Sequence, residues 1–417
     1  MNKKIKLVSL CLLGLVSFTA CKKEVSSQGA SNQTSSSSGF YDEQSKRDIE
    51  KTANTMMDKL EGVNELESVG ASINLLSLLN NDNSSDAPSN DPSFMPIAIL
   101  NSVAEFGNTG STKNVEKTLK GLTSSDNSLA NFEEAKGEYV WNGNEFIKSS
   151  SNQIIVRFPS TEGGGNDAMY SVAYEENKSK TILPEDLITP ALVDAKLTVS
   201  GKVLLQFTFK SSFDNQGMPT LVHSKMIMSP FSFEHIMNAN SSEVGQEFSF
   251  RKSGEILIGM SMGIKGSFTS DDVKAILDSG NEDAEELDPK SIKSVYTNFQ
   301  LLDLIIKSEL DVAGALKVSD LNSAEDNMEQ LNSYYKAGLY YNTNGRKIAD
   351  LQFYSKVSDS DSDPTVESTN ESKETSIRLV FPDKSKVDLS TYLQGFEKLT
   401  KDFEERLDEA MGNDTEN

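Results

Sequence analysis

Runs in which apolar and polar residues alternate with a period of two constrain the fold of this chain most. From Leu197 to Phe209, six apolar residues alternate with mainly polar ones, and Gly201 lies near the middle. Successive side chains of a strand point to opposite faces, so the run predicts one long strand with an apolar face, bent or bulged at the glycine. The run from Ile256 to Ile264 predicts another strand with its even-numbered residues on the apolar face, and Leu302 to Leu310 a third.

Two turn signals indicate that neighbouring strands are antiparallel. Asn-Gly occurs in Trp141-Asn142-Gly143-Asn144 and again in Asn342-Thr343-Asn344-Gly345, each between strand-like flanks. Asn-Gly suits the positive φ angles of tight hairpins, so each segment predicts a hairpin. Apolar residues on one face only also favour antiparallel pairing, because buried parallel strands tend to be apolar throughout.

Helical spacing of apolar residues predicts helices at both ends of the body and within it. The N-terminal segment 45–107 predicts several helices, the last opened by Pro92 and stopped by Gly107. Three further helices are expected: one after Ser270, one from Asp320 to Gly338, and one over residues 390–411.

These patterns together predict an α+β fold in a single β-rich body over residues 45–417. Its core is a curved antiparallel sheet of long strands packed by helices. An open, half-barrel-like sheet with a concave apolar face is one form that such long strands could take.

The N-terminus has the pattern of an export signal. Three lysines at positions 3, 4 and 6 form a basic head at the start of an apolar stretch that runs from Ile5 to Phe18, and Thr19-Ala20-Cys21 follows. The stretch is shorter than the roughly 20 residues of a membrane-spanning helix, so residues 1–20 are expected to be a cleaved signal peptide. Residues 21–44 then form a Ser-rich segment with little to bury, which predicts a flexible tether.

The segment Phe18-Thr19-Ala20-Cys21 resembles the lipobox of bacterial lipoprotein precursors, although Phe18 stands where leucine is usual. The resemblance implies cleavage before Cys21, diacylglycerol on its thiol and an acyl chain such as palmitate on its new amine. Two or three chains would hold the protein at a membrane firmly, because each buried methylene contributes about 0.8 kcal/mol. An ordinary signal peptide that happens to contain cysteine is the alternative.

Cysteine usage and charge exclude several classes of function. The only other cysteine, Cys11, lies within the signal, so the mature chain has no pair for a disulfide. Removal of residues 1–20 would leave 37 basic and 63 acidic residues, a net charge of −26. Such a surface repels phosphate backbones, so nucleic-acid binding is not expected.

A second resemblance concerns the segment Gly137 to Asn142, followed by Ile154 to Ser160 and Asn166-Asp167-Ala168. This arrangement is similar to one in uncharacterised envelope lipoproteins of the Bacteroidota. The resemblance implies an outer-membrane lipoprotein, on the periplasmic face or at the cell surface, and carries no activity. Lys22-Lys23-Glu24 offers one acid where surface export in that group uses several, so both faces remain open.

Candidate ligand and catalytic residues are few. The chain has two histidines, His223 and His235, and a zinc site would need more ligands in a tight geometry, so a structural role is expected for both. The Asp359–Asp363 run lacks the glycine and glutamate of a calcium loop, and the acidic run 282–288 is expected to be a solvated loop. Gly163-Gly164-Gly165 lacks the Lys-Ser/Thr of a phosphate loop and predicts a hairpin loop.

The sequence therefore predicts a membrane-anchored envelope lipoprotein with a non-catalytic binding or structural role, and Cys21 is its one assigned residue. No catalytic residue, cofactor or metal is assigned. The membrane is the expected partner, and an envelope protein or a hydrophobic ligand is a further candidate. The alternative function is a carrier of lipid or another hydrophobic ligand in a concave sheet, on faces such as Ile256 to Ile264. A third possibility is an envelope hydrolase that uses unrecognised carboxylates.

Overall fold

A computed structural model describes residues 94–109, 130–176, 190–214, 219–277, 289–319, 328–357 and 373–389, together with 66–82 and isolated positions between 47 and 118. The signal peptide, Cys21, the tether, the acidic runs 282–288 and 359–363, and the helix predicted over 390–411 lie outside the described residues. The chain divides into two compact units. Unit 1 consists of residues 1–53, 262–267 and 287–397, and unit 2 of residues 54–261, 268–286 and 398–417.

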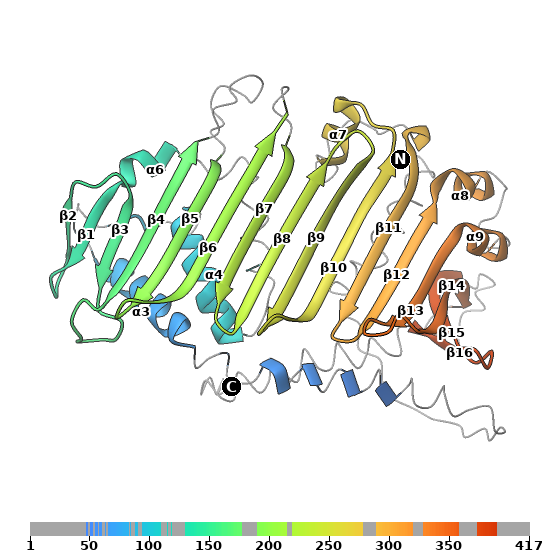
Figure 1. Ribbon diagram of the computed structural model, residues 1–417, viewed down its shortest axis with the longest axis horizontal. Helices are drawn as coiled ribbons and strands as arrows, with labels where there is room; N and C mark the ends of the chain where they lie inside the picture. Colours follow the sequence, from blue (N-terminus) through green and yellow to red (C-terminus); the bar gives the residue numbers. More distant parts are fainter. Residues whose placement is uncertain are drawn as a thin grey trace, which may run out of the picture. The chain divides into compact units, whose positions relative to one another are not determined.

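The described strands form one mixed sheet of 16 strands in the order β16-β15-β14-β13-β12-β11-β10-β9-β8-β7-β6-β5-β4-β3-β1-β2 (Figure 1). The sheet is curved and does not close, so the α+β prediction with a long curved sheet is confirmed. Nearly every strand pairs with its sequence neighbours. The exception is β3, which pairs in parallel with β1 instead of with β2, while β1 and β2 pair antiparallel.

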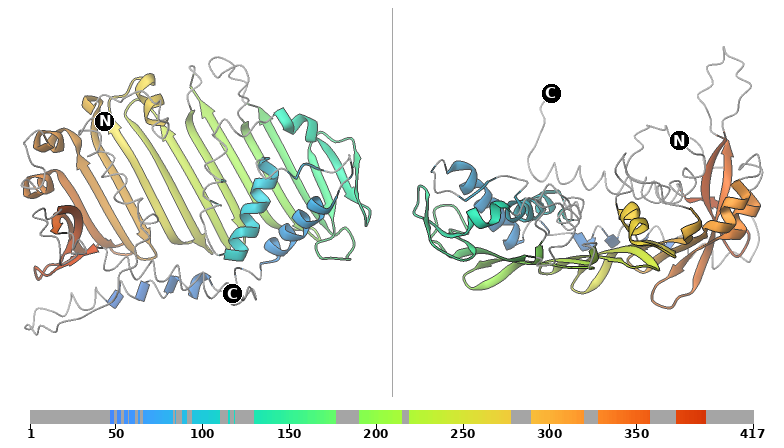
Figure 2. Two further views of the ribbon diagram at one scale, coloured as in Figure 1. Left: turned by 180° about the vertical axis from the view of Figure 1, so that it is seen from behind. Right: turned by 90° about the horizontal axis from the view of Figure 1, so that it is seen from above.

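Unit 2 holds most of the strands. Their bounds are β1 Gly137–Trp141, β2 Phe146–Ser149, β3 Ile154–Phe158, β4 Ala168–Glu176, β5 Pro190–Val199, β6 Lys202–Phe213, β7 Pro219–Met228, β8 Phe231–Ala239, β9 Glu243–Lys252 and most of β10 Glu255–Gly266. Helices α3 Glu67–Asn81, α4 Met95–Thr109, α6 Ala130–Ala135 and α7 Ser270–Leu277 accompany them. Seen from above, β1 to β3 bend toward the side on which α3 and α4 lie (Figure 2).

The core of unit 2 lies between the sheet and helix α4. Phe106 of α4 makes edge-on contacts with Phe231, Phe233 and Phe250, at centroid distances of 5.8, 5.0 and 5.7 Å. All four rings are at most 2% exposed. Such aromatic pairs add about 0.5–1.5 kcal/mol each beyond the area that they bury, so they fix α4 on β8 and β9.

Gly107 was predicted to stop its helix, but α4 continues through it to Thr109. A Cβ at Gly107 would lie 2.2 Å from Cγ1 of Val69 on α3. Gly107 therefore serves the close approach of α3 and α4, and this tertiary contact outweighs the low helix propensity of glycine.

The single long strand predicted from Leu197 to Phe209 is wrong. The segment is a hairpin of β5 and β6, in which Val199 pairs with Lys202 across the two-residue turn Ser200-Gly201. Both turn residues have positive φ, 48° and 80°. A two-residue turn alone would pair odd-numbered residues of β5 with even-numbered residues of β6, but the pairing shifts by one residue between Thr198 and Leu197, so that Leu197 pairs with Leu205. This bulge places the odd-numbered apolar residues of both strands on one face, so the period-two pattern continues through the hairpin.

The Ile256–Ile264 stripe also differs from its prediction. Leu257 is the fully buried residue near the start of β10, whereas Ile256 and Ile258 are half-buried. Alternation then places Ile256 and Ile258 on the face opposite the core side chain of Leu257. The prediction is therefore partly correct: the strand exists and Met262 of the stripe is buried, but Leu257 at an odd position is the most deeply buried residue near the start of β10.

Residues 137–142, 154–160 and 166–168 lie together in unit 2, in β1, β3 and the start of β4. The Tyr139 residue of β1 pairs with Val156 of β3, and the Asn166 side-chain amide donates to the Trp141 carbonyl at 2.7 Å. Asp167 accepts hydrogen bonds from both the backbone N–H and the hydroxyl of Ser160 at 2.8 Å, which closes the glycine loop between β3 and β4. Gly163 in that loop has a φ of 73°, so the hairpin-loop prediction is confirmed.

Unit 1 contains the other strands and two helices. Their bounds are β11 Ile292–Leu301, β12 Leu304–Asp311, α8 Val312–Ser319, α9 Met328–Tyr334, β13 Tyr335–Tyr341, β14 Lys347–Val357, β15 Lys373–Val380 and β16 Lys386–Asp388. The predicted strand from Leu302 begins at Leu304 instead, because Leu302 lies in the turn with a φ of 48°. Leu310, Leu339 and Leu351 belong to a buried cluster on one face of these strands.

The helix predicted from Asp320 to Gly338 is only partly correct. Within the described residues it runs from Met328 to Tyr334, and Tyr335 to Tyr341 is strand β13. Tyr335 pairs with Leu310, so the tertiary pairing with β12 overrides the helical spacing of the apolar residues. The helix predicted after Ser270 is confirmed as α7, with Thr269 rather than Ser270 as its cap through reciprocal bonds with Asp272.

Candidate functional site

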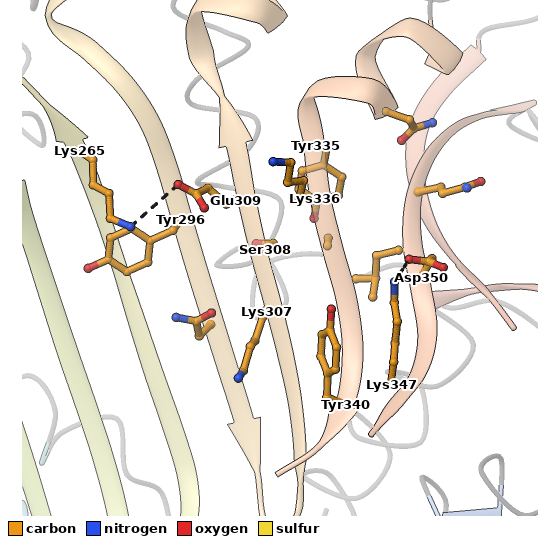
Figure 3. A pocket seen from close by; sticks show the side chains of 15 residues that line it. Lys265, Tyr296, Lys307, Ser308, Glu309, Tyr335, Lys336, Tyr340, Lys347 and Asp350 are labelled. Carbon is orange, nitrogen blue, oxygen red and sulfur yellow. Dashed lines mark hydrogen bonds and ion pairs between the residues drawn. The ribbon is translucent and has the colours of Figure 1, made fainter. Parts of the chain in front are cut away.

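A groove on the sheet of unit 1 has a volume of about 610 Å³. We call it the β13 groove, and its lining comes from the end of β10, from α9 and from β11 to β14 (Figure 3). Its described lining residues are Lys265, Tyr296, Asn298, Lys307, Ser308, Glu309, Asn332, Tyr335, Lys336, Ala337, Tyr340, Lys347, Asp350, Leu351 and Gln352. Small-molecule sites have typical volumes of about 300–1,000 Å³, so the groove is large enough for an organic ligand.

The alternation of β12 and β13 places the polar residues on the groove side. Leu304 and Leu310 of β12 and Leu339 of β13 are buried in the core cluster. The odd-numbered residues of β12 and the even-numbered residues of β13 must therefore point to the opposite face. On that face Lys307 lies opposite Gly338, and Glu309 lies opposite Lys336.

The groove continues where β13 and β14 part. Residues Gly338 to Tyr340 of β13 pair with β14, whereas the preceding residues of β13 do not. There Asn332 of α9 lies between the two strands and bonds to β14. The Asn332 amide donates to the Phe353 carbonyl at 2.9 Å and accepts from the Phe353 N–H at 2.8 Å. The Asn332 side chain thus satisfies the backbone N–H and C=O of Phe353, which a neighbouring strand would otherwise satisfy. The space beside Asn332 is part of the β13 groove.

Two ion pairs flank the groove. On one side the Lys265 ammonium lies 3.9 Å from a Glu309 carboxylate oxygen and 4.8 Å from the centroid of the Tyr296 ring. The same carboxylate accepts a hydrogen bond from the Ser294 hydroxyl at 2.7 Å. On the other side Lys347 pairs with Asp350.

Lys307, Lys336 and Tyr340 lie between these ion pairs (Figure 3). The Lys307 ammonium is 5.8 Å from the centroid of the Tyr340 ring, within the range of a cation–π contact. A Cβ at Gly338 would lie 2.8 Å from the Tyr340 hydroxyl oxygen, so the ring lies close against the bare backbone of the glycine. We call these three residues the central strip.

The charge of the groove is opposite in sign to that of the chain. Four lysines and two carboxylates line it, an excess of two positive charges, whereas the whole sequence carries a formal charge of −23. The lining also supplies hydroxyl and amide groups from tyrosine, serine, asparagine and glutamine. Chemically, such a set can hold an anion and hydrogen-bond to the body of a ligand.

The two histidines lie in unit 2 and are not brought together. Ser224 pairs with His235 and His223 pairs with Ile236, so the imidazoles project from opposite faces of β7 and β8. His235 is 4% exposed, with Nε2 3.4 Å from a Gln246 oxygen. No group of three His, Cys, Asp or Glu residues among those that the structure describes could hold a metal ion.

His223 instead belongs to a surface ion cluster. Its Nε2 is 2.8 Å from a Glu234 carboxylate oxygen, and the Lys225 ammonium is 3.5 Å from the same oxygen. Partial burial would raise the pKa of Glu234, but the His223 hydrogen bond and the Lys225 charge outweigh it and lower the pKa. These contacts fit the structural role expected for His223.

Sequence reasoning missed the β13 groove. Its lysines and tyrosines alternate with leucines along β12 and β13, which is a visible signal. However, Tyr335 to Gly338 was predicted as helix, so the cross-strand register that assembles the groove could not be foreseen.

A further missed residue is Asp82, which directly follows α3. Its carboxylate accepts hydrogen bonds from the backbone N–H groups of Phe146 and Ser84, each at 2.8 Å. This contact joins the end of α3 to β2, and nothing in the local sequence marks it.

No helix among the described residues is long and apolar enough to span a membrane. Comparison of the chain with protein-family models, with curated proteins and with solved structures found no match.

Proposed function

We propose that this protein is a lipid-anchored lipoprotein of a bacterial cell envelope that binds a ligand in the β13 groove without transforming it. The anchor is Cys21, which follows a signal peptide of residues 1–20 and is the first residue of the Ser-rich tether of residues 21–44. The outer membrane is the expected location, on its periplasmic face or at the cell surface. Partners are the membrane, through the lipid, and the groove ligand.

The observation that carries the binding role is the polar lining of the groove. It offers ammonium, hydroxyl and amide groups that can hold an anionic or polar ligand, around a volume of about 610 Å³ that is typical of ligand sites. Its two carboxylates, Glu309 and Asp350, are each paired with a lysine. These pairs, together with the hydroxyl and amide groups of the lining, support binding as the proposed role.

Lipid transport is the weaker proposal, because the apolar face of the sheet in unit 2 is occupied. Phe106 fills the space over β8 and β9, and the three phenylalanines beneath it are buried. A carrier needs open apolar space for acyl chains. The pocket found in unit 1 is lined mainly by polar residues instead.

The anchor is tested by metabolic labelling with a clickable palmitate analogue in a bacterial host that processes lipoproteins. The wild-type protein is expected to take up the label and to fractionate with membranes, whereas Cys21→Ser should do neither. Cys11→Ser is the matched control, because Cys11 lies within the expected signal and should leave labelling unchanged. Absence of label on the wild-type protein would overturn the anchor.

A further inference from the structure

The Tyr340 ring in the β13 groove leans over the bare backbone of Gly338. Both residues face the groove, because Leu339 between them is buried in the core cluster. A Cβ at Gly338 would lie 2.8 Å from the Tyr340 hydroxyl oxygen, 2.9 Å from Cε2 and 2.9 Å from Cζ. Because Cζ is bonded to both other atoms, an approach within the plane of the ring would leave Cζ clearly the farthest of the three. The near-equal distances therefore place the glycine under one face of the ring, at its hydroxyl end.

The other face of the ring is turned toward the groove. Tyr340 is half-buried and lines the groove, whereas Gly338 beneath it is buried. The Lys307 ammonium is 5.8 Å from the ring centroid, which is farther than the roughly 3.5–4.0 Å of van der Waals contact, so it is not packed on the ring. We call this ring face the Tyr340 platform. It offers a ligand an apolar surface with a hydroxyl at its edge.

The strand register places a hydrogen-bond donor and an acceptor on opposite sides of the platform. Lys307 of β12 and Asp350 of β14 are the two cross-strand partners of Gly338, and neighbouring strands are about 4.8 Å apart. Figure 3 shows Tyr340 between Lys307 and the Lys347–Asp350 pair. A carboxylate has about four acceptor positions, so the bond to Lys347 leaves Asp350 able to accept from a ligand as well.

This combination selects for a ligand with an apolar face and hydroxyl groups at its edge. Asp350 only accepts hydrogen bonds and would repel an anion, whereas the Lys307 ammonium only donates. A hydrocarbon would remove water from both charged groups and return no hydrogen bond. A sugar ring meets all three requirements, because its C–H groups can stack on the tyrosine while its hydroxyls donate to Asp350 and accept from Lys307.

From this geometry we propose that the β13 groove binds a neutral saccharide, with one sugar ring stacked on Tyr340 and hydrogen-bonded to Asp350 and Lys307. The groove volume of about 610 Å³ lies in the range of small-molecule sites, and the amides of Asn298 and Gln352 line it for further hydrogen bonds. This inference rests on the proposed binding role and names the ligand class for that site.

The test is a glycan array probed with the full chain. The protein is solubilised in a detergent that has no sugar headgroup, so that the detergent does not compete for the groove. The array carries neutral oligosaccharides of hexoses and N-acetylhexosamines beside sialylated and sulfated ones. The wild-type protein is expected to bind neutral glycans. Absence of binding to every neutral glycan would overturn the inference, and so would binding to the sialylated or sulfated glycans alone.

Two variants of Tyr340 test the platform through apparent Kd values on the same array. Tyr340→Ala should weaken binding of the recognised glycans about tenfold or more, because the stacking surface is lost. Tyr340→Phe keeps the ring face and should bind within about threefold of the wild type. Binding by Tyr340→Ala as tight as that of the wild type would overturn the inference.

A second pair of variants tests the acceptor beside the platform. Asp350→Ala should weaken binding about two- to tenfold, the effect of one lost hydrogen bond. Glu329→Ala is the matched control, because Glu329 is an exposed carboxylate of α9 outside the groove lining. It should leave binding unchanged, and equal losses in both variants would overturn the role of Asp350.

Thermal-shift measurements with nucleotides, amino acids and sugars make the failure of this inference distinguishable from failure of the binding role. A ligand that binds the folded state raises the melting temperature. A shift with a nucleotide or an amino acid that Tyr340→Ala abolishes, without glycan binding, would overturn the saccharide inference and keep the binding role. No shift and no glycan binding would overturn both. Circular dichroism of each variant shows whether it folds as the wild type does, so that loss of binding is not mistaken for loss of structure.

Discussion

The carboxylate of Asp82 shows how much one side chain can decide. Burial alone would raise the pKa of Asp82, but the backbone N–H groups of Phe146 and Ser84 favour the charged form more strongly and lower the pKa. Phe146 is 1% exposed, so its N–H has no water to replace the carboxylate. Asp82 therefore satisfies a buried donor on the edge strand β2 and ties α3 to the sheet.

We predict that Asp82→Ala lowers the free energy of unfolding of unit 2 by about 1–3 kcal/mol, the cost of leaving a buried donor unsatisfied. Asp82→Asn keeps an acceptor oxygen and should cost less. Urea unfolding at neutral pH, followed by circular dichroism, measures both. An Asp82→Ala variant as stable as the wild type would show that the bond to Phe146 contributes nothing.

The lowered pKa of Asp82 also predicts a dependence on pH. Because the folded pKa lies below the unfolded value of about 3.9, the stabilisation is fully present above that value. It is lost as the pH falls through the folded pKa, when the carboxyl protonates in the folded state. The stability difference between wild type and Asp82→Asn should therefore shrink in acid; a difference that grows below pH 4 would contradict this assignment.

At the scale of elements, the packing of α3 on α4 depends on Gly107. A methyl group there would meet Val69, so we predict that Gly107→Ala destabilises unit 2 by about 1–3 kcal/mol despite the better helix propensity of alanine. Gly70 on α3 is the control, because no atom lies within 4 Å of a Cβ placed there. Gly70→Ala should stabilise unit 2 by about 0.5–1 kcal/mol. Thermal melts should therefore show a lower melting temperature for Gly107→Ala and a higher one for Gly70→Ala.

The β5–β6 turn gives a second prediction at this scale. Ser200 and Gly201 both have positive φ, which Asn-Gly adopts more readily than Ser-Gly. Ser200→Asn should therefore raise stability by a few tenths of a kcal/mol, whereas Gly201→Ala should lower it by about 1 kcal/mol. A Cβ at Gly201 meets no atom within 4 Å, so that loss would report backbone strain alone. Chemical denaturation of both variants measures whether the free energy of unfolding rises in Ser200→Asn and falls in Gly201→Ala.

The elements also show where sequence reasoning succeeded. The Asn-Gly hairpins at Gly143 and Gly345 were predictable because glycine at positive φ is a local requirement. The Ser200-Gly201 turn was missed because alternation runs through it unbroken, and β13 was mistaken for helix because its pairing with β12 is not local. Failures of this kind are expected wherever a distant strand, rather than the local pattern, selects the structure.

At the scale of the whole molecule, the excess of acidic residues should make stability depend on salt. The sequence carries 63 acidic and 40 basic residues, and like charges repel in a compact state. Raising the ionic strength from about 0.01 M to about 0.15 M shortens the screening length from about 30 Å to about 8 Å. We predict that the melting temperature rises over this range, and a fall measured by circular dichroism would contradict it.

The sequence by itself determined the α+β class, the two Asn-Gly hairpins, helix α7 and the expectation of a lipid anchor at Cys21. These features depend on local requirements: backbone conformation at glycine, helix capping, periodicity and short recognition segments. Only the tertiary structure decided that Leu257 faces the core, that Gly107 serves helix packing and that Asp82 holds β2. The β13 groove belongs to this second group, because the register of β12 on β13 sets Lys307 opposite Gly338 and Glu309 opposite Lys336, while Glu309 and Asp350 pair with Lys265 and Lys347. Register joins residues about 30 apart, and no local pattern encodes it.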